Sequence, residues 1–404
     1  MKVAFIVSKF PCYDEAFILR ELYGLSKEMD MVISSLRKSE ETMIHDEARE
    51  LLSKTFYIPY FFSVKVQWAQ VLMLFKHPVK YVRTFIKVLI GNLKSPEFLF
   101  KSLIFFPKSV YLANWFEENK ITHIHAYWAT YPATAAFIAS KITGIPFSFT
   151  GHAHDIYLDT TFLRRKMLGA MFVTTCTKQN KNHLLKIVRH YPERKILVNY
   201  HGLELEKFHV NGKERNKIFE ILSVGTLQDH KGFQYLISAL ALLKERALNF
   251  TCTIIGGGPL ESDLRKHIRL LNLESSVVMT GPLKQSEVLP YYQKADLLIL
   301  MAQPEWHWGI PNVLIEALAA KTPVITTKFG SVEELVQDGV TGLIVPPKDP
   351  KALADQVEKL YREDFFRKKL AEAGHQLIVE NFSLEKNIRV FQKALAHEDA
   401  ALLN

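Results

Sequence analysis

The chain has 404 residues, of which 48% are hydrophobic and 23% charged, and its formal net charge is +9. This length exceeds one ordinary core and predicts two domains, and the composition excludes a disordered or low-complexity protein. The three cysteines, Cys12, Cys176 and Cys252, form no CxxC pair, which argues against a disulfide framework or zinc site and fits a reducing cytoplasm. The opening MKVAFIVSKF has too short an apolar run for a signal peptide, so we expect a cytoplasmic protein that begins with a buried strand.

Short apolar runs alternate with helix-like segments in the first half of the chain. The expected strands are 2–7, 31–35, 123–126, 147–150, 171–176 and 195–198. Such alternation predicts an α/β fold with a parallel, doubly wound sheet.

The region 56–116 is basic and aromatic, with eight basic residues against one acidic residue, Glu97. The basic residues are Lys65, Lys76, Lys80, Arg83, Lys87, Lys94, Lys101 and Lys108. One interpretation is a set of amphipathic helices that lie on an anionic membrane surface. The other is a set of helices that pack their aromatic faces on the core and solvate their lysines. No charge-free run is long enough to span a bilayer, and no nucleic-acid-binding motif accompanies the charge, so we expect no nucleic-acid partner.

A second α/β pattern follows the polar stretch 209–217. Its expected strands are 218–225, 251–256, 277–280, 296–301, 324–327 and 342–345. We therefore expect an N-terminal domain over 1–208, a linker over 209–217 and a C-terminal domain over 218–381. Ligands of such folds bind at the carboxyl ends of the strands, so function is expected in the loops that follow them.

The stretch WHWGIPNVLIEALAAKTPVITT, residues 306–327, combines a turn, a helix and one carboxylate. Pro311 suits the first helical position, so the amides of Asn312 and Val313 would sit at a positive helix end that can hold a diphosphate. Glu316, about one turn further, would accept hydrogen bonds from ribose hydroxyls. The alternative is a plain surface helix that leads into a buried strand.

Other loops after expected strands carry small or basic residues. Lys231 precedes an expected helix over 233–244 and would neutralise a phosphate, or else is simply solvent-exposed. Gly256 and Gly257 permit close backbone approach to a ligand. Together with the turns at 309–313 and 330–331, these loops are expected to converge on one edge of one sheet.

In the first domain, an expected strand runs into Gly151-His152-Ala153-His154-Asp155. Two histidines and an aspartate suggest a metal site, but no distant third ligand is evident. A histidine bound to a sugar is the preferred interpretation, and a structural corner is the alternative. His123 and His125 are expected to be one core and one cleft residue.

Four segments of the second half resemble, in order, the retaining glycosyltransferases of family 4. They are VGTLQDHKGFQYLISAL, IIGGGPLESDLRKHIRLLNL, VVMTGPLKQSEVLPYYQKADLLILMA and GIPNVLIEALAAKTPVITTKFGSVEELVQDGVTGLIVPP. The segments VSKFPCYDEAFILREL, THIHAYWATYPAT and FSFTGHAHDIY are similar to the exopolysaccharide or colanic-acid-type subgroup. The resemblance implies a GT-B fold of two Rossmann-like domains facing a cleft, with a C-terminal helix, 382–404, that crosses back to the first domain.

The resemblance also implies roles for particular residues. Glu316 would bind the ribose, Lys231 the donor diphosphate and His152 the transferred sugar, and these three form the implied catalytic set. The implied donor-binding residues are Thr226, Gly256, Gly257, Trp308, Gly309, Ile310, Asn312, Val313, Gly330 and Ser331, and His154 and Asp155 are placed on the acceptor side. The donor would be a UDP- or GDP-linked sugar, with no metal and no other cofactor, because lysine and helix amides neutralise the leaving diphosphate.

Two positions depart from the family pattern. Thr226 stands where the family usually has an arginine, and Trp308 stands where it usually has a glutamate. Glu305 would reach the place of the glutamate if the loop is shifted, and Trp306 or Trp308 would stack on a sugar face. Arg265 and His230 would be substitute cations for the arginine.

We expect a retaining glycosyltransferase at the inner face of the cell membrane that transfers a sugar to a glycan or lipid-linked oligosaccharide in cell-surface polysaccharide biosynthesis. The alternative is a catalytically weak GT-B protein that serves as a glycan-binding or partner subunit of a membrane assembly.

Overall fold

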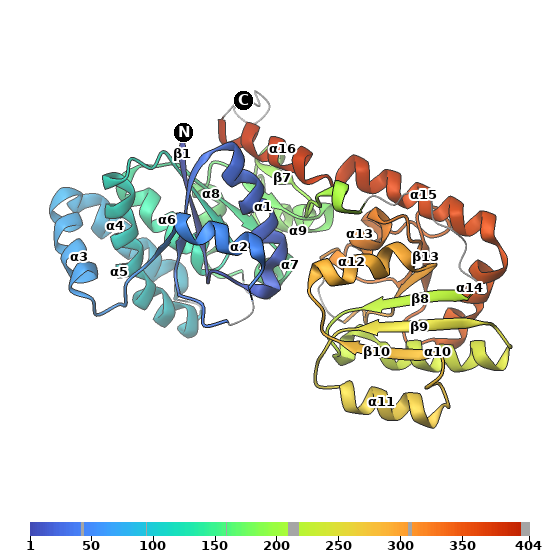
Figure 1. Ribbon diagram of the computed structural model, residues 1–404. Helices are drawn as coiled ribbons and strands as arrows, with labels where there is room; N and C mark the ends of the chain where they lie inside the picture. Colours follow the sequence, from blue (N-terminus) through green and yellow to red (C-terminus); the bar gives the residue numbers. More distant parts are fainter. Residues whose placement is uncertain (42–43, 94, 159, 209–217, 306–308, 397–404) are drawn as a thin grey trace. The chain divides into compact units, whose positions relative to one another are not determined.

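The computed structural model describes residues 1–41, 44–93, 95–158, 160–208, 218–305 and 309–396. Contacts divide the chain into two compact units (Figure 1). Unit 1 comprises Met1–Gly202 with Leu384–Asn404, and unit 2 comprises Leu203–Ser383. The expected linker, 209–217, lies outside the described residues.

Within its described residues, unit 1 contains a parallel sheet of seven strands in the order β3-β2-β1-β4-β5-β6-β7. The strands are β1 (Lys2–Val7), β2 (Asp30–Ser35), β3 (Thr55–Tyr57), β4 (His123–Tyr127), β5 (Phe147–Gly151), β6 (Val173–Thr175) and β7 (Ile196–Val198). Six of them are the expected strands. The three-residue β3 is too short to produce a recognisable pattern.

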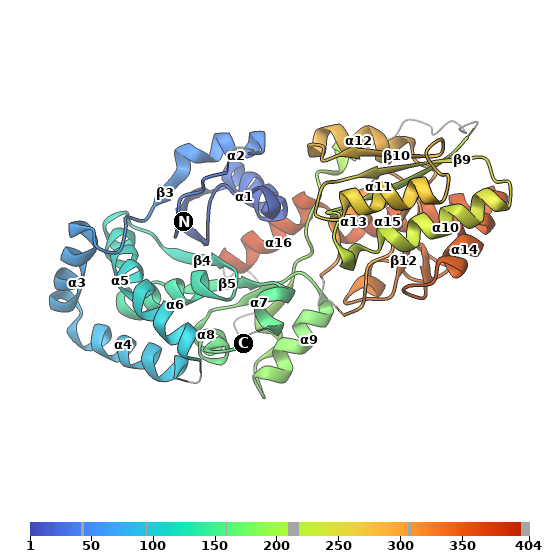
Figure 2. The same cartoon turned by 90° about the horizontal axis from the view of Figure 1, so that it is seen from below.

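Helices cover both faces of this sheet (Figure 2). They are α1 (Ala16–Glu28), α2 (Asp46–Leu51), α3 (Val64–Lys76), α4 (Pro78–Asn92), α5 (Pro96–Glu118), α6 (Tyr131–Thr143), α7 (Ala153–Tyr157), α8 (Leu163–Gly169), α9 (Lys178–Ile187) and α16 (Leu384–Ala396). Alternate residues of β1 enter opposite cores, because side chains alternate along a strand. Ala4 and Ile6 pack with α5 and α6, whereas Val3 and Phe5 pack with α1 and α16.

The C-terminal helix α16 packs closely against α1. A Cβ placed on Gly24 of α1 would lie 2.2 Å from Cδ1 of Ile388. Glycine at this position therefore allows the two helices to approach. The buried apolar residues Leu384, Ile388, Phe391 and Leu395 lie on one face of α16, at the spacing expected for an amphipathic helix.

One expectation for unit 1 is wrong. His123 and His125 are both buried core residues, and a hydrogen bond of 2.8 Å joins each of them to the hydroxyl of Ser148. Residues two apart in a strand share a face, and helices cover both faces of a doubly wound sheet, so neither histidine lies in a cleft.

In the described part of unit 2 (203–208, 218–305 and 309–383), six parallel strands have the order β10-β9-β8-β11-β12-β13. They are β8 (Phe219–Val224), β9 (Phe250–Ile255), β10 (Val277–Gly281), β11 (Leu297–Leu300), β12 (Val324–Thr327) and β13 (Leu343–Val345). The helices are α10 (Phe233–Glu245), α11 (Glu261–Leu270), α12 (Gln285–Lys294), α13 (Asn312–Ala319), α14 (Pro350–Arg362) and α15 (Asp364–Asn381). The strand order reverses between β8 and β11, which is where ligands of doubly wound sheets bind.

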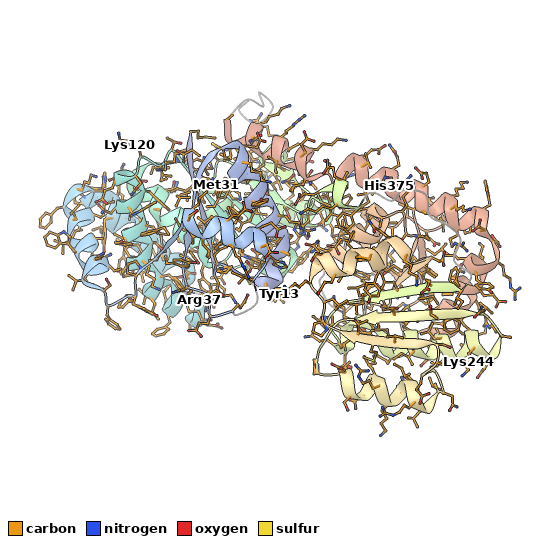
Figure 3. All side chains as sticks on the ribbon, in the orientation of Figure 1. Tyr13, Met31, Arg37, Lys120, Lys244 and His375 are labelled. Atoms are coloured by element: carbon orange, nitrogen blue, oxygen red, sulfur yellow. The ribbon has the colours of Figure 1, made fainter. Side chains whose placement is uncertain are left out.

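Helix α13 is held at its end by α15. The ring Nδ1 of His375, labelled in Figure 3, lies 3.0 Å from the carbonyl oxygen of Ala319. This contact fixes the carboxyl end of the helix whose amino end begins the candidate site.

Candidate functional site

The loops after β8 and β9 are bound to each other at the carboxyl edge of the unit 2 sheet. The amide of Leu227 donates to the carbonyl oxygen of Gly257 at 3.0 Å. A Cβ placed on Gly256 would lie 1.9 Å from the carbonyl oxygen of Gly225. The glycine run therefore allows the two loops to approach each other, in addition to any approach to a ligand.

Lys231 lies in the loop after β8, in the short 3-10 helix Asp229–Lys231. Gly232 follows with a φ of 69°, and a Cβ there would lie 2.0 Å from the carbonyl oxygen of Met301, so this loop also packs on the loop after β11. The stem of Lys231 lies beside Gly225, and burial lowers the pKa of Lys231 to about 7. A poorly solvated ammonium group at this edge would gain from an anionic partner.

The start of α13 differs by one residue from expectation. Pro311 is the extended residue before the helix, with φ −66° and ψ 130°, and Asn312 is the first helical residue. The amide of Leu314 already donates to the carbonyl oxygen of Pro311 at 3.1 Å. The amides of Asn312 and Val313 come before it, and such amides have no partner inside a helix. The expected anion-binding character of this helix start is therefore unchanged.

Glu316 is buried, and both of its carboxylate oxygens accept hydrogen bonds from α12. The Gln285 side-chain amide donates to Oε1 and the Tyr292 hydroxyl donates to Oε2, each at 2.9 Å. These donors fix the orientation of the carboxylate.

Gln285 and Tyr292 were not predicted. They lie seven residues apart in α12 and so on one face of the helix, and this spacing of polar groups was the available signal.

The remaining donor-side residues lie in the same loops. Gly309 and Ile310 precede α13, and Gly330, with a φ of 42°, and the buried Ser331 follow β12. The expected convergence of small-residue loops on one sheet edge is thus present in unit 2. Thr226 follows β8 and is exposed.

The suggested replacement residues are placed less favourably. Glu305 is exposed and forms an ion pair with Lys348 at 3.0 Å. Arg265 forms an ion pair with Glu261 in its own helix. His230 adjoins Lys231 and is partly exposed. Trp306 and Trp308 lie outside the described residues.

In unit 1, His152 is buried where β5 ends and α7 begins. Asp155 is also buried, and its carboxylate accepts hydrogen bonds from the amides of His152, at 2.6 Å, and Ala129. Burial raises the pKa of Asp155 to about 7. The structure therefore places Asp155 as a brace between two loops, whereas His154 is exposed on α7.

The His152 ring lies in an aromatic cluster with Phe17, Trp128 and His201. The ring centroids of His152 and Trp128 are 4.5 Å apart, and those of His152 and His201 are 5.4 Å apart. Burial lowers the pKa of His152 to about 3, so its imidazole is neutral. Sequence reasoning missed Trp128 and His201, because only the tertiary fold brings them to His152.

Among the described residues, no group of three or more histidine, cysteine, aspartate or glutamate side chains is arranged to hold a metal ion. The contact between His152 and the transferred sugar, which the resemblance implies, stays a prediction.

Comparison with known proteins identifies the family. Residues 205–377 match the family model described as Glycosyl transferases group 1. Residues 205–377, which make up most of unit 2, belong to this family. The match confirms the predicted resemblance to family 4.

Two relatives come from polysaccharide biosynthesis. The amylovoran biosynthesis glycosyltransferase AmsK of Erwinia amylovora is 35% identical over 167 residues, which are 40% of this chain and 41% of AmsK. WcaL of Salmonella typhimurium, named provisionally as a colanic acid biosynthesis glycosyltransferase, is 33% identical over 177 residues, 43% of this chain and 44% of WcaL. The chain thus matches about two fifths of the length of these two relatives.

The solved structure of HepE from Anabaena, in complex with UDP, matches 98% of this chain and 100% of its own with a TM-score of 0.73 at 17% identity. At this identity the match shows the fold alone. The predicted GT-B fold is confirmed.

Proposed function

We propose that the chain is a retaining glycosyltransferase that moves a sugar from a UDP-sugar to a glycan acceptor in polysaccharide biosynthesis. The observation that carries the proposal is the arrangement of Glu316, the start of α13 and Lys231 along one edge of the unit 2 sheet. A site for a nucleoside diphosphate needs an acceptor for the ribose hydroxyl groups and, beside it, groups that compensate the negative charge of the phosphates. Glu316 would be the acceptor, and Lys231 and the start of α13 would compensate the charge.

The proposed roles of the residues follow from the negative charge that develops on the diphosphate during sugar transfer. As the glycosidic bond to the diphosphate breaks, negative charge grows on the leaving phosphate oxygens. The Lys231 ammonium and the amides of Asn312 and Val313 would stabilise that charge without a metal ion. Glu316, held by Gln285 and Tyr292, would fix the ribose. By resemblance, His152 would contact the transferred sugar.

The donor and acceptor classes are supported by the relatives. HepE has been solved with UDP and with UDP-glucose, so UDP-glucose is the first donor to test. AmsK is named for amylovoran biosynthesis and WcaL for colanic acid biosynthesis, so we infer a glycan acceptor, which would be lipid-linked if assembly occurs at a membrane.

An anionic membrane surface is proposed as a partner because unit 1 exposes apolar side chains beside basic ones. Phe62 and Phe75 are 87% and 81% exposed, and Trp68 is 63% exposed. Val79, Val82, Ile86 and Ile90 add an exposed stripe along α4. The helices α3 and α4 lie together at one end of unit 1 (Figure 1).

Basic side chains flank this apolar surface. Lys80, Arg83 and Lys87 are exposed on α4, next to its apolar stripe. Other aromatic residues of the same region, including Phe106 and Trp115, pack on the core, as the second interpretation of the region expects. Among the described residues, no helix is both long enough and apolar enough to cross a bilayer. Apolar side chains ringed by lysine and arginine favour adsorption to anionic lipid.

The proposed function is tested by titration calorimetry with UDP and GDP, followed by a transfer assay with UDP-glucose and bacterial membranes as the acceptor source. We expect UDP to bind and Glu316→Gln to weaken binding about tenfold or more, since hydrogen bonds to a charged group are lost. Glu333→Gln, at an exposed glutamate paired with Lys328, is the matched control.

Failure of both nucleotides to bind would reject the nucleotide site. Binding without transfer or hydrolysis of UDP-glucose or other UDP-sugars would favour the alternative of a non-catalytic partner subunit, which Thr226 and Trp308 motivate.

A further inference from the structure

Two cationic side chains, Arg37 and Lys108, lie near each other in unit 1. Arg37 is exposed and stands two residues after the end of β2, and Lys108 is half-buried on α5. Leu36, which precedes Arg37, is buried in the same core cluster as Phe106 of α5, so the loop after β2 packs against this helix. Burial and the nearby charge of Arg37 both lower the pKa of Lys108.

Neither of these cations forms an ion pair with a residue that the structure describes. Two acidic residues of the same loop and helix are already used, because Glu41 pairs with Lys9 and Glu97 pairs with Lys101. Like charges that are held together without a counter-charge repel each other, and a bound anion removes that cost. The pair therefore favours an anionic ligand.

An apolar stripe of α5 leads to the cation pair. Phe100, Ile104 and Lys108 follow one another at a spacing of four residues, so they lie along one face of the helix. Phe100 is 65% exposed and Ile104 is 37% exposed. The Lys108 Nζ also lies 5.9 Å from the centroid of the Phe105 ring. Exposed hydrocarbon and positive charge thus adjoin on the same helix face.

This part of α5 lies at the carboxyl edge of the unit 1 sheet. The rings of Phe98 and Phe105 stack on Tyr131, with centroids 5.4 Å and 5.1 Å away, and Tyr131 begins α6 just after β4. Figure 3 shows Arg37 at the same end of unit 1 as Tyr13, which follows β1. The strand order reverses between β1 and β4, so ligands are expected at this edge.

The chemistry of these groups selects the ligand. An arginine fork bonds two phosphate oxygens at once, and a lysine adds a second positive charge. Two cations therefore fit a diphosphate better than the single negative charge of a phospholipid phosphodiester. The apolar stripe gains free energy when a hydrocarbon chain covers it. A ligand with both parts is an apolar chain that ends in a diphosphate.

We propose that Arg37 and Lys108 bind the diphosphate of a lipid-linked acceptor, with Phe100 and Ile104 against its apolar chain. The inference rests on the proposed function for the role of this ligand as the acceptor. It adds the chemical nature of the linkage and the residues of unit 1 that hold it.

Calorimetry on the full chain tests the inference, with UDP present to occupy the unit 2 site. The ligands are geranyl diphosphate, geraniol, inorganic pyrophosphate and dihexanoyl phosphatidylglycerol. We expect geranyl diphosphate to bind at least about tenfold more tightly than geraniol or the phosphatidylglycerol, since it alone combines a double charge with an apolar chain.

Substitutions on both parts of the site sharpen the test. Arg37→Gln and Lys108→Gln should each weaken binding of geranyl diphosphate about tenfold, because a charge-assisted contact is lost. Phe100→Ser should weaken it about threefold and leave the affinity for pyrophosphate unchanged. Lys120→Gln, at an exposed lysine just after the carboxyl end of α5, is the matched control and should change neither affinity.

Three results would overturn the inference. They are equal affinity for geranyl diphosphate and geraniol, unchanged affinity in both Arg37→Gln and Lys108→Gln, and equal affinity for dihexanoyl phosphatidylglycerol, which would assign the cations to bulk phospholipid. Thermal unfolding shows whether each variant is folded, and if one variant does not fold the other still decides. A separate titration with UDP reports on unit 2, so failure of the nucleotide site is distinguished from failure of this one.

Discussion

The hydroxyl of Tyr292 donates a hydrogen bond to the carboxylate of Glu316 at 2.9 Å, from a helix that the sequence motif around Glu316 does not include. Tyr292 is itself almost completely buried, and its carbonyl oxygen accepts a hydrogen bond of 2.6 Å from the hydroxyl of Thr322. The orientation of the Glu316 carboxylate, which we propose to bind the ribose, therefore depends on α12 as well as on α13.

Removal of this donor should weaken nucleotide binding without abolishing it. In Tyr292→Phe the Glu316 carboxylate keeps only the Gln285 donor of the two described here, so we expect UDP affinity to fall about three- to tenfold and stability to fall by about 1 kcal/mol. Calorimetry and thermal unfolding measure both. Tyr291→Phe, at the neighbouring partly exposed tyrosine, is the control, and equal effects of the two substitutions would contradict the orienting role.

Lys231 should make nucleotide binding depend on pH. Burial lowers its pKa to about 7 in the free protein, so above pH 7 the ammonium form becomes the minority. A bound diphosphate favours the charged form, so binding at pH 8 should take up a proton, and affinity should fall as pH rises. Calorimetry in buffers of different ionisation enthalpy measures the uptake.

Two variants separate this effect from the titration of other groups. Lys231→Arg keeps a permanent charge and should bind UDP without proton uptake, whereas Lys231→Gln should bind UDP weakly at every pH.

The ionisation of Lys231 also changes the stability of the protein, in a direction that its pKa determines. Its folded pKa lies below its ordinary value of 10.5, so the unfolded chain holds the proton more firmly and this group's contribution to stability rises between about pH 7 and pH 10.5. If the pH dependence of UDP affinity and of stability were the same in Lys231→Gln as in the unchanged protein, this role of Lys231 would be contradicted.

Gly256→Ala should disrupt the site through backbone contact. The added Cβ would lie 1.9 Å from the carbonyl oxygen of Gly225, so the loops after β8 and β9 must separate. We expect a stability loss of about 2–4 kcal/mol and the loss of UDP binding. Gly281→Ala is the matched control, because Gly281 also has positive φ but has open space around the added atom. It should cost about 1 kcal/mol from backbone strain alone, with binding retained.

Vesicle binding should depend on the exposed aromatic residues of unit 1. Phe62→Ser and Phe75→Ser each remove one exposed apolar side chain. Each single substitution should weaken binding to vesicles of equimolar phosphatidylcholine and phosphatidylglycerol about tenfold. Co-sedimentation measures the partition. Phe365→Ser, at a phenylalanine of unit 2 that is 83% exposed, controls for general loss of surface apolarity. Equal binding of all variants, or equal binding to vesicles of phosphatidylcholine alone, would reject the anionic membrane partner.

The sequence predicted those parts of the molecule that depend on local pattern. Buried parallel strands form continuous apolar runs, so the strands of both sheets were recognisable, apart from the three-residue Thr55–Tyr57. Glu316 and Lys231 were proposed because each stands near the start of a helix that follows an expected strand, and their roles stay predictions. The position of Pro311 was wrong by one residue, because proline suits both the residue before a helix and its first residue.

The partners of these residues were not predictable in the same way. Gln285 and Tyr292 contact Glu316 across 31 and 24 positions of sequence. Trp128 and His201 follow different strands from the strand that precedes His152. The seven-residue spacing of Gln285 and Tyr292 places them on one helix face, but nothing in the neighbouring sequence identifies Glu316 as their partner. Only strand order determines which loop residues become neighbours, and strand order is a property of the whole sheet.

The return of the chain at α16 has a consequence for biosynthesis. Gly202 packs on Leu384, where an added Cβ would lie 2.6 Å from the Leu384 Cα, and Phe391 of α16 lies in the same core as Phe5 of β1. Residues 384–396 leave the ribosome after every described strand of unit 2. Unit 2 can therefore complete its core first, whereas one face of the unit 1 sheet stays incompletely covered until α16 has been made.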